Sequence, residues 1–229
     1  MITLEDLEKT IGVTFTDKTL LERAFIHRSY LNEAKHIKIS NERLEFLGDA
    51  VLSFLTSHFL YETYPEYPEG TLTNIRSSLV KTNSLAETAK TLNLGDVLKL
   101  SHGEEASGGR SNSSLLADCF EALLGALFLD QGIDSAKKFL TTYLFPKTTD
   151  IIDKKSYIDY KSLLQEIVQQ DSRISPTYHV TKSEGPDHAK TFWIQVSVGT
   201  TVLGSGEGKS KQEAEQAAAH FALEKLGKT

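Results

Sequence analysis

Apolar residues recur at spacings of three and four along the first two thirds of the chain, which is the periodicity of amphipathic helices. The longest such stretches are 43–61, 72–92 and 114–129. Short segments rich in turn-forming residues separate them, such as HGEEASGGR at 102–110. Because no convincing strand pair interrupts the pattern, it predicts an all-α domain over residues 1–147.

The pattern changes after residues 148–156, which are mostly polar and charged and predict a linker. A helical pattern over 159–170 precedes two segments in which apolar and polar residues alternate, 176–184 and 190–198. A short third strand and a helix follow, and Ser210 with Glu213 three residues later is a capping box typical of a helix start. The order helix, three strands, helix predicts a small α+β domain over 157–229.

Acidic residues interrupt two of the most apolar helical stretches. Glu45 and Asp49 lie four residues apart, with Glu42 one turn earlier, so one helix face carries all three. Asp118 and Glu121 lie three apart in a stretch of Leu, Ala, Cys and Phe. Burying an unpaired carboxylate costs several kcal/mol or more, so two such pairs suggest a shared cation. Oxygen ligands without His or Cys favour Mg²⁺ or Mn²⁺, and carboxylate-held magnesium serves phosphodiester hydrolysis.

An alternative reading places these acids on solvated helix faces. Acidic pairs at this spacing usually face water beside Lys or Arg, and Arg43 or Arg76 could neutralise one carboxylate. Periodicity alone supports the cation-site interpretation and the solvated-face interpretation about equally.

Composition narrows the class of protein without identifying its chemistry. The net charge is −6, all of it carried by residues 1–150, while 151–229 are balanced, so bulk charge does not point to nucleic acid. Cys119 is the single cysteine, which excludes a disulfide within the chain and fits the cytoplasm. No apolar run of membrane-spanning length and no signal-peptide pattern occurs, so a soluble cytoplasmic protein is expected.

Several motifs in one order resemble the bacterial ribonuclease III family. They are AFIHRSY (24–30), NERLEFLGDAVL (41–52), EGTLTNIRSSLV (69–80), GEEASGGR (103–110) and SLLADCFEALLGALFLD (114–130). The resemblance implies an Mg²⁺-dependent endoribonuclease, with Mn²⁺ as a substitute and no small-molecule cofactor. It implies cleavage of double-stranded RNA, in ribosomal and other structured precursors, to 5′-phosphate and 3′-hydroxyl ends. The metal-binding catalytic residues it implies are Glu45, Asp49, Asp118 and Glu121, with Glu42 and Glu69 as accessory acids.

The same resemblance gives Phe46 a role that its position alone does not suggest. An aromatic residue beside a candidate catalytic acid would normally be core. In the family, the matching residue packs into a socket on a second subunit, which implies a homodimer. A non-catalytic dsRNA-binding dimer is the alternative, but intact acids at all four catalytic positions argue against it.

The C-terminal part is similar to double-stranded-RNA-binding domains. DYKSLLQE (159–166), EGPDHAK (184–190) and GEGKSKQEAEQAAA (206–219) carry this resemblance. It implies minor-groove contacts by Gln165, Glu166 and the loop around His188. It also implies phosphate contacts by Lys209 and Lys211. Gln212 occupies a position where many such domains have Lys, and Glu215 one where some have a basic residue. Weak or salt-sensitive binding to RNA phosphates is therefore expected.

Overall fold

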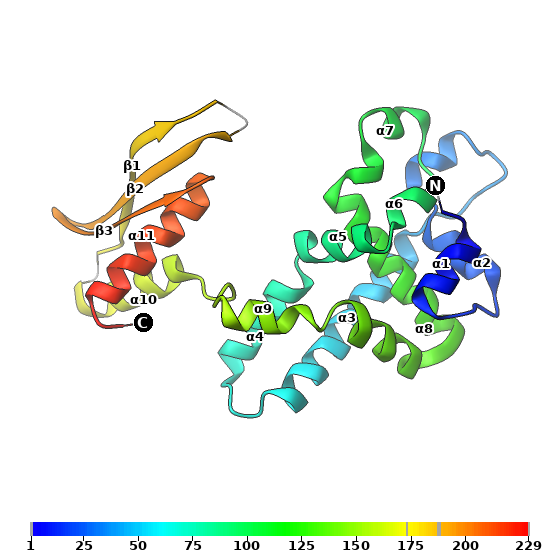
Figure 1. Ribbon diagram of the computed structural model, residues 1–229, viewed down its shortest axis with the longest axis horizontal. Helices are drawn as coiled ribbons and strands as arrows, with labels where there is room; N and C mark the ends of the chain where they lie inside the picture. The colour runs from blue at the N-terminus through cyan, green and yellow to red at the C-terminus, as the bar shows by residue number, and fades with distance from the viewer. Residues whose placement is uncertain (1, 173, 187–188, 229) are drawn as a thin grey trace. The chain divides into compact units, whose positions relative to one another are not determined.

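The chain forms two compact units that divide between Tyr157 and Ile158. The computed structural model describes residues 2–172, 174–186 and 189–228 (Figure 1). The first unit is helical, as predicted. Its helices are α1 (Leu4–Ile11), α2 (Lys18–Ala24), η1 (Arg28–Asn32), α3 (Glu42–Thr63), α4 (Glu69–Val80), α5 (Thr82–Thr91), α6 (Leu94–Val97), α7 (His102–Ala106), η2 (Gly109–Ser111), α8 (Ser113–Tyr143) and α9 (Lys147–Asp153).

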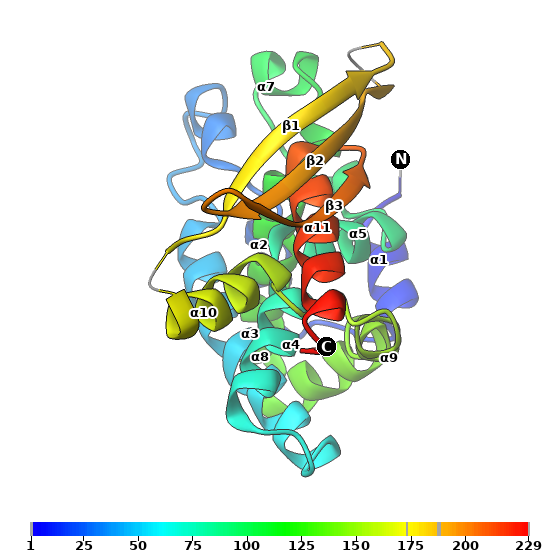
Figure 2. The same cartoon turned by 90° about the vertical axis from the view of Figure 1, so that its left-hand side faces the viewer.

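Helices α3 and α8 form the centre of this unit and lie side by side (Figures 1 and 2). Their buried residues, such as Leu52 and Phe120, join those of α1, α2 and α5 in one core. Burial of that apolar surface is the main force that holds the bundle together. The pair is therefore a rigid support for any side chains that it carries.

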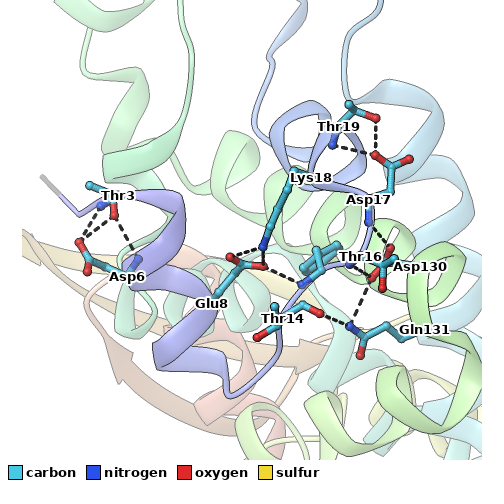
Figure 3. A network of polar contacts seen from close by, with 11 residues as sticks. Thr3, Asp6, Glu8, Thr14, Thr16, Asp17, Lys18, Thr19, Asp130 and Gln131 are labelled. Atoms are coloured by element: carbon cyan, nitrogen blue, oxygen red, sulfur yellow. Dashed lines mark hydrogen bonds and ion pairs between the residues drawn. The ribbon is translucent and has the colours of Figure 1, made fainter.

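The N-terminal segment braces α8 where that helix bends. Gly132 has a left-handed φ of 80°, which breaks the helical path. Just before it, the Asp130 carboxylate accepts hydrogen bonds from the backbone N–H groups of Thr16 and Asp17 at 2.9 and 2.8 Å (Figure 3). The Gln131 amide donates to the carbonyl oxygen of Thr14 at 2.6 Å. These bonds connect the start of the chain to the bend.

Two features of the helical unit differ from the sequence-based expectation. The stretch 72–92 is two helices, because Lys81 adopts an extended backbone with ψ of 150° between α4 and α5. The expected linker, 148–156, is largely helix α9, whose Thr148 is buried and which packs on α4. Its polar composition reflects a helix with only one buried residue.

The second unit is a three-stranded antiparallel sheet with two helices, which confirms the expected fold class. Its elements are α10 (Tyr160–Ser172), β1 (Thr177–Glu184), β2 (Thr191–Val198), β3 (Thr201–Gly208) and α11 (Lys211–Lys225), with strand order β1-β2-β3. Ile194 and Val196 on β2 are buried, and α11 packs on the same sheet (Figure 2). Gly206 on β3 allows this close approach, because a Cβ there would overlap the backbone of Ala218.

A capping interaction fixes the start of α11. The Ser210 hydroxyl accepts a hydrogen bond from the Glu213 N–H at 3.1 Å, and the Glu213 carboxylate accepts one from the Lys209 N–H at 2.8 Å. The carboxylate thus reaches one residue further back than in the usual capping box. Separately, no described helix combines the length and apolar character needed to cross a membrane.

Candidate active site

Two glycines bring α3 and α8 into backbone contact. A Cβ at Gly48 would overlap the carbonyl oxygen of Glu121, and one at Gly125 would overlap that of Leu44. Neither position can carry a larger residue without separating the helices. Because residues 45 and 49 flank Gly48 on its helix, the contact places the acids of α3 against those of α8.

Three carboxylates meet at this contact. Oxygen atoms of Glu45, Asp118 and Glu121 all lie within 4.8 Å of one another. Each side chain is half-buried. Within the described part of the chain, none of the three forms an ion pair with Lys or Arg. The solvated-face reading, with Arg43 or Arg76 as partner, therefore does not hold for these acids, and Arg76 donates instead to the Ser57 hydroxyl.

Burial raises the pKa of every member of this cluster, and repulsion from neighbouring acids adds to the effect for Glu45 and Glu121. Burial, followed by the charges of Asp49, Asp118 and Glu45, raises the pKa of Glu121 to about 8. The pKa of Glu45 is raised by burial first and then by Asp118. Burial also raises the pKa of Asp118. The folded protein thus gathers acidic groups that no Lys or Arg ion pair among the described residues balances.

The donor set of the cluster fits a hard divalent cation. All its atoms are carboxylate oxygens, which Mg²⁺ and Mn²⁺ prefer. The one soft ligand nearby, Cys119, is fully buried in the hydrophobic core, and burial raises the pKa of its thiol well above the usual range. A cation between the three carboxylates would relieve their repulsion.

The other predicted acids lie at different distances from the cluster. Asp49 is exposed and is not one of the three grouped carboxylates, although its charge acts on Glu121. Glu42 lies at the edge, where it accepts a hydrogen bond from the Ser40 hydroxyl at 2.7 Å and pairs with Arg28 at 3.8 Å. Glu69 is outside the cluster, at the start of α4, and accepts a hydrogen bond from Thr73.

A hollow of about 280 Å³ opens beside the cluster. Its lining combines the acids Glu42, Glu45 and Asp118 with His27, Arg28, Asn41, Leu98 and Leu115. Sequence reasoning gave His27 and Arg28 no role at the site, although both belong to the AFIHRSY motif that carried the family resemblance. The lining of the hollow thus combines carboxylates with side chains that carry nitrogen donors.

Phe46 is 81% exposed although it follows Glu45 directly. The default expectation of a core position is therefore wrong within this chain. A second, larger hollow of about 950 Å³ lies near the far end of α3 and the start of α4. Aromatic and aliphatic side chains dominate its lining, among them Phe54, Leu60, Tyr61, Tyr64, Tyr67 and Leu72, and Glu69 stands at its wall.

The predicted RNA-contacting residues lie on the second unit. Gln165 and Glu166 are exposed on α10, and Lys209 and Lys211 are exposed at the start of α11. His188 lies outside the described residues. Gln212 is also exposed, in the first turn of α11.

Glu215 is bound within its own domain. Its carboxylate forms an ion pair of 2.5 Å with Lys161 on α10, and both side chains are mostly buried. Residues 161 and 215 are 54 positions apart, so periodicity could not reveal this pair. The Lys161 ammonium also lies 4.9 Å from the centre of the Tyr178 ring.

Comparison with known proteins agrees with both units. Residues 17–148 match the Ribonuclease-III-like family model, and residues 160–226 match the double-stranded RNA binding motif. Ribonuclease 3 of Enterococcus faecalis is 47% identical over 225 residues, with 96% of each chain covered. Ribonuclease 3 of Streptococcus thermophilus is 46% identical over 227 residues, with 97% of each covered.

A solved structure agrees at the level of the first unit. The nuclease domain of ribonuclease III from Campylobacter jejuni, described for flexibility in a region involved in dimer formation, superposes with a TM-score of 0.59 at 38% identity. The superposition covers 63% of this chain and 99% of the Campylobacter jejuni chain. Together with the near full-length relatives, the two matched domains and the acid cluster between α3 and α8, this shows that the chain belongs to the ribonuclease III family of endoribonucleases.

Proposed function

We propose that this protein cleaves double-stranded RNA with Mg²⁺ at the cluster of Glu45, Asp118 and Glu121. The observation that carries the proposal is the meeting of three half-buried carboxylates within 4.8 Å without a cationic partner among the described residues. By family resemblance, the products carry 5′-phosphate and 3′-hydroxyl ends, and the substrates are ribosomal and other structured precursor RNAs. A protein that acts on such substrates would work in the cytoplasm.

The positions of the acids support the catalytic roles that the family resemblance implies. Glu45, Asp118 and Glu121 would hold the cation, and exposed Asp49 adds negative charge or a ligand from the same helix face. Bound Mg²⁺ supplies a water of lowered pKa and stabilises charge on the phosphate oxygens. Mn²⁺ has similar ligand preferences and would substitute. Glu42, held by the Ser40 hydroxyl, supports the rim of the hollow.

The second domain would bind the RNA duplex by its shape. Gln165 and Glu166 on α10 would contact hydroxyl groups in one minor groove, and the loop around His188 would contact the next. Lys209 and Lys211 would contact the phosphates between the grooves. Free N–H groups at a helix start also favour phosphate. The match to the double-stranded RNA binding motif supports this assignment.

We also propose a homodimer in which Phe46 enters the aromatic hollow of a second copy. An 81% exposed Phe and an apolar hollow on the same chain are complementary surfaces. A two-fold dimer uses each surface twice. Because Glu69 lines that hollow and Glu45 precedes Phe46, docking would bring Glu69 toward the partner subunit's Glu45. This explains how Glu69 can support a site that it does not reach within one chain.

A cleavage assay on long double-stranded RNA tests the proposed activity. Wild-type protein with Mg²⁺ should produce short duplexes, and protein in excess chelator should not. Glu121→Gln should lower the cleavage rate by about a thousandfold or more, because a ligand and its charge are lost while the side-chain volume is kept. Its affinity for the duplex should stay within about twofold.

The matched outcomes separate an enzyme from a dsRNA-binding scaffold. Duplex binding without cleavage by wild-type protein in Mg²⁺ or Mn²⁺ would identify a scaffold. Cleavage at the wild-type rate by Glu121→Gln would remove this cluster from the reaction.

A further inference from the structure

His27 begins the short helix η1 and is held in one tautomer by its neighbours. Its Nδ1 accepts a hydrogen bond from the Ser29 N–H at 3.3 Å, which caps the helix. Nδ1 also lies 2.8 Å from the Ser29 hydroxyl oxygen. A backbone N–H can only donate, so Nδ1 carries no proton in this arrangement.

The Ser29 hydroxyl strengthens the same assignment. Its oxygen accepts a hydrogen bond from the Ser101 N–H at 3.0 Å. Its own proton is therefore available to donate to Nδ1 of His27. With two donors directed at Nδ1, the neutral ring carries its proton on Nε2, at the opposite edge.

His27 lines the hollow beside the acid cluster, together with Glu45 and Asp118. Among the described residues, the only hydrogen bonds of the ring are at Nδ1, so the Nε2–H is left for a group that approaches the cluster. The group that must approach the cluster, under the proposed function, is the phosphodiester of the RNA.

We propose that the Nε2–H of His27 donates a hydrogen bond to a nonbridging oxygen of the RNA phosphate that lies against the acid cluster. The proposal rests on the proposed function and adds a substrate-contacting residue to it. The Ser29 and Ser101 hydrogen bonds keep this donor oriented before the RNA arrives, so no ordering is needed on binding. The Arg28 side chain is 73% exposed and pairs with Glu42, whereas His27 is half-buried.

The cap alone does not require histidine. Ser, Asp and Asn are the preferred capping residues, because a short side-chain oxygen accepts the same N–H. Asn at position 27 would therefore keep the hydrogen bond to Ser29 N–H and place no donor where Nε2 lies. Gln would place an N–H near that point instead. The two substitutions separate the two roles of the ring.

The experiment measures cleavage of a defined duplex by wild-type protein, His27→Asn and His27→Gln in Mg²⁺, with thermal unfolding as a control for folding. His27→Asn should unfold like wild-type protein and lose about tenfold to a hundredfold in kcat/KM, the usual effect of losing a hydrogen bond to a charged group. His27→Gln should recover part of that loss. Mn²⁺ affinity should be unchanged in both.

A thio-substituted substrate tests the contact itself. One sulfur at either nonbridging position of the scissile phosphate weakens a hydrogen bond to that atom. For one of the two diastereomers, the losses caused by sulfur and by His27→Asn should not multiply, because both remove the same contact. A purely structural histidine would give independent losses for both diastereomers.

Three results would overturn the inference. They are full activity in His27→Asn, a loss explained by weaker Mn²⁺ binding, and independent losses with both thio-substituted duplexes. All are read against an active wild-type protein. An inactive wild-type protein would instead reject the proposed function, and the inference with it.

Discussion

Glu121 and Glu215 occupy similar positions in the two domains, each partly buried on a helix beside a second helix, but their surroundings are opposite. Glu215 meets Lys161 of the neighbouring helix at 2.5 Å. Glu121 meets Glu45 and Asp118, and its pKa is raised to about 8. One charge is balanced within the chain, and the other is left for a ligand.

The difference shows how to recognise a site built for a cation. A paired acid contributes to the architecture of its own domain and needs nothing further. Like charges gathered at a helix contact lower the stability of the folded protein, so they persist where a bound ligand offsets the cost. The exposed Phe46 is the corresponding case for apolar surface, because its side chain is left for contact with another molecule.

The largest expected effect concerns that apolar surface. Phe46→Asp should turn a dimer into a monomer over a concentration range of at least about a hundredfold, because a charge cannot be buried in an aromatic hollow without several kcal/mol of cost. Sedimentation velocity measures this directly, with Phe221→Asp, another exposed Phe but on α11, as a control. A Phe46→Asp dimer of wild-type affinity would contradict the proposed interface.

The next effect is the pH dependence of stability without metal. Carboxylates whose folded pKa is raised bind more protons in the folded than in the unfolded state, so the free energy of unfolding falls as pH rises from 4.5 to about 8. In chelator, Glu121→Gln should flatten this fall and gain roughly 1–3 kcal/mol at pH 8. Urea unfolding at several pH values measures both. A steeper fall in the variant would reverse the assignment.

Glu215 should give a small effect of opposite sign. Glu215→Gln should destabilise the protein by about 1 kcal/mol or less, since the pair with Lys161 remains partly exposed. A double-mutant cycle with Lys161→Met isolates the pair energy by thermal unfolding of the second domain. A stabilised Glu215→Gln would mean that its charge is as unbalanced as that of Glu121.

A comparably small effect is expected on RNA affinity. Gln212→Lys adds one cation in the exposed first turn of α11. It should strengthen duplex binding by roughly threefold to tenfold at moderate salt and steepen the salt dependence by about one unit of slope. Fluorescence anisotropy at several salt concentrations measures this, with Thr200→Lys, exposed in the turn between β2 and β3, as a charge-matched control. Equal gains in duplex affinity for both variants would mean that the added net charge, and not its position on α11, strengthens binding.

Local patterns in the sequence predicted the elements well because they reflect local physics. The periodicity of three and four marked α3 and α8, and alternation marked β1 and β2. The capping pair Ser210 and Glu213 marked the start of α11. The break at Lys81 and the helix α9 were missed: the composition around both is not distinctive, and α9 is stabilised by packing on α4.

The sequence predicted only part of the candidate site. Spacing placed the acids on helix faces, but only the structure shows that Gly48 and Gly125 bring those faces together. Pairing over long sequence separation stayed hidden in the same way. Lys161 with Glu215, and Ser101 with Ser29, depend on the folded chain. Family resemblance supplied what periodicity left open, and the catalytic roles it implies stay a prediction.

The most direct test of the account is the binding of Mn²⁺ in the absence of RNA, followed by electron paramagnetic resonance near neutral pH. Wild-type protein should bind Mn²⁺ and release protons on binding, because Glu121 is partly protonated below about pH 8. Glu121→Gln should weaken that binding by at least about tenfold, and Glu215→Gln should not change it. Equal Mn²⁺ binding by all three proteins would contradict the claim that this cluster is held ready for a metal ion.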